Sequence, residues 1–222
     1  MNGTSIESIR GRRVWDSRGR PTVEAEVRLR NGMRGRAIAP AGASTGTAEA
    51  VDLRDGGQRF GGMDVSRACA AINEVISGEL AGHDIAEQAQ LDSRLVALDG
   101  TPNRSRLGGN ALVATSMALL HARAAAAGQP VWRLLAKKSK VRMPLPEIQI
   151  FGGGAHAARR VDVQDFMIMC PAARSFAEAL EWTAEVYLAA GALLKRSGPC
   201  KAWPTRAATG RRSRPTSRRW TR

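Results

Sequence analysis

The fold is set by residues 5–40, SIESIRGRRVWDSRGRPTVEAEVRLRNGMRGRAIAP. Residues 5–15 and 22–30 alternate polar and apolar side chains, which is typical of strands with one buried face. The stretch NGMRG at 31–35 predicts a tight turn, and the segment RAIAP at 36–40 predicts a third strand. Because the three strands follow one another closely, we expect an antiparallel meander at the start of the fold.

A helical region is predicted after this sheet. A loop rich in glycine, alanine and serine, PAGASTGTAEAVDLRDGG at 40–57, lies between the two. Apolar periodicity predicts three helices, at 65–80, 85–98 and 107–127. Asp84 is the expected N-cap of the second helix, and Gly128 is the expected C-cap of the third. A short helix at 131–138 then ends a first domain, predicted as residues 1–138.

The pattern changes after the polar linker KKSK. Residues 144–151 (PLPEIQIF) and 161–169 (VDVQDFMIM) are short apolar runs of strand type, and a helix is predicted at 175–195. One face of that helix carries Phe176, Leu180, Ala184, Tyr187 and Leu188. Two strands and a helix do not close a sheet, so residues 143–197 are interpreted as the first part of a larger α/β domain.

The positive charge is concentrated at the C-terminal end. The chain of 222 residues has a formal net charge of +14. Residues 200–222, CKAWPTRAATGRRSRPTSRRWTR, hold Lys201 and seven arginines with no acidic residue. Such a stretch is either an arm that contacts nucleic-acid phosphates or a disordered tail outside the fold.

No long apolar run predicts export or membrane insertion. No such run follows the N-terminal methionine, so no secretory signal is expected. The most apolar stretch, 111–127, contains His121 and Arg123, which favours a core helix over a membrane span. The three cysteines have no metal-ligand spacing and indicate reduced thiols; they are Cys69, Cys170 and Cys200. We therefore expect a cytoplasmic protein without a membrane segment.

Five stretches of the sequence stand out as motifs: WDSRGRPTVEAEV at 15–27, GASTGTAEAVDLRDGG at 42–57, LDGTPNRSRLGGNAL at 98–112, GGGAHAARRVDVQDFMIMCP at 152–171 and SFAEALEWTAEVY at 175–187. In this order and at this spacing they resemble the enolase family of glycolytic lyases. Members of that family dehydrate 2-phosphoglycerate to phosphoenolpyruvate. The resemblance covers residues 5–197. It implies an α+β N-terminal domain, with a three-stranded antiparallel meander plus helices, followed by the first part of an enolase-type α/β (TIM-like) barrel.

The resemblance implies a catalytic loop in the first domain. Ser44 matches the residue that binds the second of two Mg²⁺ ions when the loop closes over the substrate. Ala43 and Thr45, its neighbours, are expected to contact the substrate as well. Gly42 and Gly46 would let such a loop hinge and approach a phosphate closely. Taken without the other motifs, GASTG would be read as an ordinary surface loop.

The resemblance implies two catalytic residues in the barrel. His156 matches the active-site histidine, although a histidine taken alone is more often structural. Gln164 matches a substrate-contacting glutamine, and Asp165 matches the acidic residue after it; their alternative is a solvated strand end. Three positions depart from the family pattern and indicate a divergent member. Asp165 stands where glutamate is usual, and Ala41 and Phe151 replace serine and asparagine.

The tail has a separate explanation. The family pattern continues after Lys195 with a segment such as LQGVADEGGYWPAF. One choice of codons for that segment, read one base later, gives CKAWPTRAATGRR, which is residues 200–212. We therefore interpret residues 198–222 as a basic, off-frame and disordered tail.

Further catalytic groups of the family lie beyond residue 198 of its pattern. They are the proton-donating glutamate, the metal-binding carboxylates and the base lysine. The sequence thus predicts an enolase-type lyase that is truncated and inactive as given. Its expected partners are a small phosphorylated hydroxy acid and, when complete, a second copy in a homodimer. The alternatives are a nucleic-acid-binding protein that uses the arginine-rich tail and a non-catalytic fragment.

Overall fold

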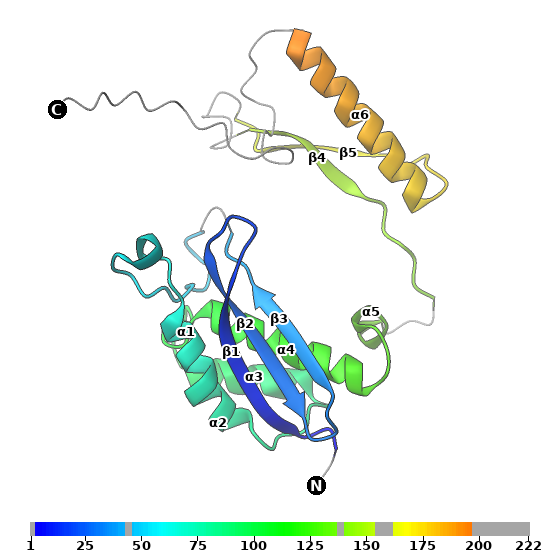
Figure 1. Ribbon diagram of the computed structural model, residues 1–222. Helices are drawn as coiled ribbons and strands as arrows, with labels where there is room; N and C mark the ends of the chain where they lie inside the picture. The colour runs from blue at the N-terminus through cyan, green and yellow to red at the C-terminus, as the bar shows by residue number, and fades with distance from the viewer. Residues whose placement is uncertain (1–2, 43–45, 137–139, 154–161, 197–222) are drawn as a thin grey trace, which may run out of the picture. The chain divides into compact units, whose positions relative to one another are not determined.

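The computed structural model describes residues 3–42, 46–136, 140–153 and 162–196. The chain divides into two compact units, Met1–Ser139 and Lys140–Arg222. Each unit has its own sheet and its own helix or helices (Figure 1). The predicted tail at 198–222 lies outside the described residues.

The first unit begins with the predicted antiparallel meander. Its strands are β1 (Ile6–Trp15), β2 (Pro21–Leu29) and β3 (Arg34–Ala39), in the order β1-β2-β3. The turn between β2 and β3 contains Gly32 at a φ of +85°, a conformation that glycine adopts without steric cost. The NGMRG stretch therefore forms the tight turn that the sequence predicts.

The two faces of this sheet differ in chemistry. The inner face supplies apolar side chains to the core; they are Ile9, Val23, Ala25, Val27 and Ala37. The outer face carries paired charges on neighbouring strands. Arg12 donates to Glu24 and, over 3.4 Å, to Glu26. The alternation of the sequence thus places an apolar layer against the helices and a charged layer on the opposite side.

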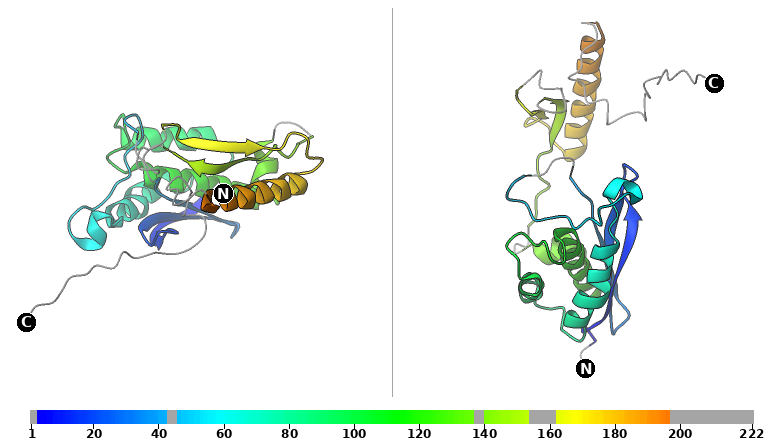
Figure 2. Two further views of the ribbon diagram at one scale, coloured as in Figure 1. Left: turned by 90° about the horizontal axis from the view of Figure 1, so that it is seen from above. Right: turned by 90° about the vertical axis from the view of Figure 1, so that its left-hand side faces the viewer.

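The helices of the first unit are η1 (Arg59–Gly62), α1 (Ser66–Ala70), η2 (Ala71–Ile76), α2 (Ser77–Leu80), α3 (Gln88–Asp99), α4 (Gly109–Ala126) and α5 (Val131–Leu135). Of these, α1, η2 and α2 pack on β1, while α3 and α5 pack on α4 (Figure 2). The stretch from α1 to α2 is one continuous helix with a π-helical middle, where a plain α-helix is predicted. The long helix α4 packs on β2 and β3.

Gly35 explains how α4 can lie so close to β3. A Cβ atom at this position would be 2.1 Å from Ala122 N and 2.2 Å from Ala118 O. Both are backbone atoms of α4, which cannot turn away as a side chain could. The glycine therefore fixes the distance between the sheet and its main helix.

The second predicted helix starts later than expected. It begins at Gln88 and not at residue 85, and Asp84 is not its N-cap. Asp84 Oδ1 accepts the N–H of Ala86 (2.8 Å), and its Oδ2 accepts the Thr4 hydroxyl (3.0 Å). The carboxylate thus joins a turn to the chain before β1, and the buried Ile85 belongs to that turn.

The ends of the two following helices are also defined. Gly128 follows α4 at a φ of +62°, and its N–H donates to Ala125 O (3.1 Å). The C-cap itself is Ala127, one residue before the predicted one, and Gly128 takes the left-handed position that follows it. Helix α5 stops at Leu135, before the predicted end at residue 138.

The second unit contains a hairpin and one long helix. Strands β4 (Glu147–Gly152) and β5 (Asp165–Met169) are antiparallel, and α6 (Phe176–Arg196) lies against β5. The buried residues of α6 include Ala179 and Thr183, which are small. The large side chains predicted to share one face are mostly exposed: Phe176 by 41%, Leu180 by 41% and Leu188 by 70%. Two strands are too narrow to cover that face.

Candidate active site

The first unit has a polar cavity beside the GASTG loop. Its volume is about 640 Å³. Residues before, within and after the loop line it, together with the residue that follows η1 and one from the α3–α4 connection; they are Pro40, Ala41, Gly42, Gly46, Thr47, Glu49, Ala50, Val51, Asp52, Arg54, Met63 and Asn103. The cavity thus lies where the resemblance predicts the substrate loop.

A strap of five residues, 51–55, forms one wall of this cavity. Both backbone polar groups of Val51 are hydrogen-bonded. Its N–H donates to Asn103 O (2.8 Å), and its carbonyl accepts the N–H of Gly109 (2.8 Å). Leu53 is held by the amide of Asn110, which accepts its N–H and donates to its carbonyl, both over 3.1 Å.

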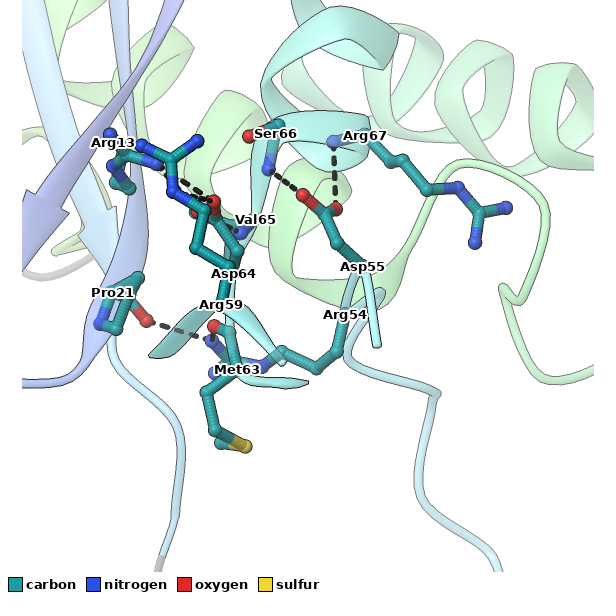
Figure 3. Close-up of polar contacts among 10 residues, drawn as sticks. All are labelled: Arg13, Pro21, Arg54, Asp55, Arg59, Met63, Asp64, Val65, Ser66 and Arg67. Carbon is teal, nitrogen blue, oxygen red and sulfur yellow. Dashed lines mark hydrogen bonds and ion pairs between the residues drawn. The ribbon is translucent and has the colours of Figure 1, made fainter. Parts of the chain in front are cut away.

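The strap is also joined to the sheet and to α1 (Figure 3). Arg54 Nη1 donates to the carbonyls of Pro21 (2.7 Å) and Met63 (2.9 Å). The Asp55 carboxylate accepts the first N–H groups of α1, from Ser66 (2.9 Å) and Arg67 (3.0 Å). These N–H groups have no partner within their own helix, so Asp55 acts as a cap from outside it.

Asp64 is a second carboxylate beside the strap, and it is almost fully buried, with 2% of its side chain exposed. Arg13 Nη1 donates to both of its oxygens, over 2.7 and 2.9 Å. Arg59 Nε lies 3.4 Å from Oδ2. Figure 3 shows both guanidinium groups directed at it. The hydrogen bond from Arg13 is the main reason why the pKa of Asp64 is lowered, and it outweighs the effect of burial.

The described part of the loop itself makes local contacts. Gly46 N–H donates to Glu49 Oε1 (2.9 Å), and Glu49 N–H donates to Gly46 O (3.3 Å). Residues 46–50 are all exposed. The predicted site residues Ala43, Ser44 and Thr45 lie outside the described residues.

In the second unit, two of the predicted residues lie at the start of β5: Gln164 precedes the strand and Asp165 is its first residue. The Asp165 carboxylate accepts amide N–H groups from Gln149 on β4 and from Gln164 over 3.5 Å. The carbonyl of Gln164 accepts the N–H of Gly153 (2.6 Å). Gln164 and Asp165 are therefore brought together at an exposed strand end, while His156 lies outside the described residues. Gln149 is not among the predicted site residues. The alternation of polar and apolar residues in EIQIF places it on the polar face of a strand, which is the signal that could have found it.

One finding limits the metal chemistry of the described residues. Within residues 3–42, 46–136, 140–153 and 162–196, no three His, Cys, Asp or Glu side chains lie close enough to hold a metal ion. The described residues therefore do not fit a magnesium site by themselves. No helix in the same part of the chain combines the length and apolar character needed to cross a membrane.

Comparison with known proteins gives matches over both units. Residues 6–135 match the family model of the enolase N-terminal domain, and residues 140–203 match that of the enolase C-terminal TIM barrel domain. An enolase of Acidothermus cellulolyticus is 49% identical over 193 residues, which are 87% of this chain and 45% of the relative. Enolase 1 of Desulfitobacterium hafniense is 44% identical over 198 residues, which are 89% of this chain and 45% of the relative.

The two matches define a protein with an α+β domain followed by the start of a TIM barrel, as the sequence predicts. The chain belongs to the enolase family, which is a family of lyases. It spans somewhat less than half the length of these two relatives.

Proposed function

We propose that this chain carries part of the active site of an enolase-type lyase, which dehydrates 2-phosphoglycerate to phosphoenolpyruvate. The single observation that supports this best is the polar cavity of about 640 Å³ beside GASTG, with its rigid wall at 51–55. This wall is joined by hydrogen bonds to the sheet, to α1 and to the start of α4. The identity of 49% with an enolase supports the same reaction.

The proposed roles follow the positions of the residues. Ser44 binds one of two Mg²⁺ ions, and Ala43 and Thr45 contact the substrate. Magnesium, when bound, stabilises negative charge that develops on the substrate. His156 and Asp165 act at the barrel side of the site. Asp165 is the shorter homologue of the usual glutamate, and the amides of Gln149 and Gln164 hold its carboxylate in one orientation.

The remaining proposals concern the setting of the reaction. The substrate is a small phosphorylated hydroxy acid, and the pathway is glycolysis in the cytoplasm. Cys69 and Cys170 are free thiols, which supports a reducing compartment. A chain with a complete barrel forms a homodimer.

The activity can be tested with a hybrid enzyme. Residues 1–196 of this chain are joined to the remaining barrel of the Acidothermus cellulolyticus enolase, and phosphoenolpyruvate formation is followed by its ultraviolet absorbance. The hybrid should turn over with Mg²⁺ and lose activity with a chelator. His156→Ala should reduce kcat by at least about a hundredfold if this residue acts in catalysis. A folded hybrid without turnover would contradict the proposal.

The 222-residue chain itself is the matched control. We expect it to show no turnover above background, even with abundant Mg²⁺, because the family's base lysine and metal carboxylates are not among its motifs. Turnover by this chain that a chelator abolishes would show that the prediction of inactivity is wrong.

A further inference from the structure

We propose that Asn110 is a positioning residue, which fixes the strap at 51–55 and thereby one wall of the cavity. Its catalytic meaning rests on the proposed function, but its structural role can be tested without activity. Asn110 lies at the start of α4 and is 3% exposed. It does not line the cavity, so it acts through the strap.

The two hydrogen bonds between Asn110 and Leu53 take the place of the backbone hydrogen bonds that a neighbouring strand would make. An amide side chain offers a donor and an acceptor together, and so can satisfy both the backbone N–H and the backbone carbonyl of one residue. Here Oδ1 accepts the N–H of Leu53 and Nδ2 donates to its carbonyl, each over 3.1 Å. Because Leu53 is buried, these groups would otherwise lose water without gaining a partner.

The two glycines before Asn110 make room for this contact. A Cβ at Gly108 would be 2.5 Å from both Asn110 Oδ1 and Leu53 Cβ. A Cβ at Gly109 would be 2.9 Å from Ala50 Cβ. The GGN part of the motif LDGTPNRSRLGGNAL is thereby explained as close packing of α4 on the strap. A glycine-rich phosphate cradle is not needed to account for it.

Asp99, near the other end of the motif, holds the connection between α3 and α4 in place. Asp99, 1% exposed, accepts the N–H of Thr101 (3.0 Å) and of Leu107 (2.7 Å). Burial would raise the pKa of this carboxyl, but these hydrogen bonds and the Thr101 hydroxyl lower it overall. The connection that Asp99 closes contains Asn103, whose carbonyl holds Val51. One motif therefore holds the strap at both Val51 and Leu53.

The loop and the strap meet at a sharp boundary. Residues 46–50 are exposed and bonded locally, whereas Val51, Leu53 and Arg54 are joined to other elements. Residues 51–53 are therefore the anchored part of the cavity wall, and Asn110 sets their position.

Hydrogen exchange on the 222-residue chain tests this role, with Asn110→Ala compared with Asn73→Ala. Asn73 is a matched control, because its amide makes the same pair of bonds with Gly11 N–H (2.8 Å) and Gly11 O (3.0 Å), at the edge of β1. The readout is the Val51 N–H, whose own acceptor is Asn103 and remains unchanged in both variants.

Each variant is measured at the same number of degrees below its own unfolding temperature. Under these conditions, the Val51 N–H should exchange at least about tenfold faster in Asn110→Ala than in Asn73→Ala. Equal rates in the two variants would overturn the proposal. Asn110→Asp keeps the acceptor for Leu53 N–H and serves as the second variant should the alanine variant not fold; it too should speed Val51 exchange relative to Asn73→Ala.

The hybrid enzyme separates the anchor from the proposed reaction. In an active hybrid, Asn110→Ala should lower kcat/KM by about tenfold, mainly through a higher KM, and Asn73→Ala should leave both constants unchanged. If Asn110→Ala speeds Val51 exchange but the hybrid is inactive, the positioning role of Asn110 stands and the proposed function is contradicted. An active hybrid in which both variants behave alike would contradict the positioning role.

Discussion

At the scale of single residues, carboxylates from neighbouring segments supply the polar contacts at the start of α1. Val65, at the N-cap position, has no polar side chain, and Asp55 from the strap accepts two N–H groups of the first turn. Asp64 instead joins η1 to β1 through Arg59 and Arg13. Each carboxylate links segments that are separate in sequence, so its removal affects more than one element.

Asp64→Asn should make stability less dependent on pH in the acidic range. The folded pKa of Asp64 lies below its ordinary value of 3.8, so the carboxylate stabilises the fold above that value. This contribution is lost as the pH falls through the lowered pKa. The variant should therefore have a smaller free energy of unfolding than the wild type at pH 7, and the difference should narrow below about pH 4.

Urea unfolding at several pH values measures this difference. Glu87→Gln, at an exposed position before α3, is the control and should change stability little. A difference between Asp64→Asn and the wild type that stays constant down to the most acidic pH would contradict the role of the ion pair.

At the scale of elements, α6 is apolar on more of its surface than the hairpin covers. Ala179 and Thr183 of α6 are buried against the hairpin, while Leu188 and Leu193 are 70% and 62% exposed. Strand β5 (DFMIM) likewise lacks alternation and exposes Met167 and Met169. Strands that are buried on both faces have this composition. The elements of the second unit thus have apolar surface for neighbours on several sides.

Substitutions on the two faces of α6 should have opposite effects. Leu188→Glu should reduce self-association and retain helix, because it removes exposed apolar surface and glutamate is a good helix former. Ala179→Glu should weaken the packing of α6 on β5 by about 3 kcal/mol, because it buries a charge. Analytical ultracentrifugation and circular dichroism measure these effects. Equal self-association of Leu188→Glu and the wild type would contradict the first expectation.

At the scale of the whole molecule, the two units differ in how much core they bury. The first has a continuous apolar core between its sheet and helices, from Ile6 on β1 to Ala122 on α4. In the second, the buried apolar side chains among the described residues include Ile150 and Ala179. Hydrophobic burial is the main stabilising contribution in folding, so the first unit should be the more stable of the two.

Limited proteolysis should therefore leave a resistant fragment that ends near residues 138–140. The second unit should be digested, because its hairpin has open edges and its helix exposes apolar side chains. Mass spectrometry of the fragments identifies the end. A single resistant species that includes residues 175–195 would contradict this expectation and show that the second unit is ordered by itself.

Much of the fold could be predicted because its signals are local. Alternation at 5–15 and 22–30 gave β1 and β2 to within a residue, and the family motifs gave the order of domains. The start of α3 could not be predicted, since Asp84 resembles an N-cap but is engaged by Thr4. Of the candidate site, the roles of Gln164 and Asp165 stay predictions from the resemblance, and the structure places both residues at the start of β5. Their hydrogen-bonding neighbour Gln149 was missed, because pairing across a hairpin depends on its register.

The sequence by itself determined the period of each element, the family and the residue types at the proposed site. These follow from side chains within a few positions of one another, or from the order of motifs. Only the tertiary structure decided that GGN packs on the strap, that Asp55 caps α1, and which stripe of α6 is buried. Such contacts join residues far apart in sequence. Their partners are chosen by packing and by the need of buried polar groups for hydrogen bonds, which no local pattern records.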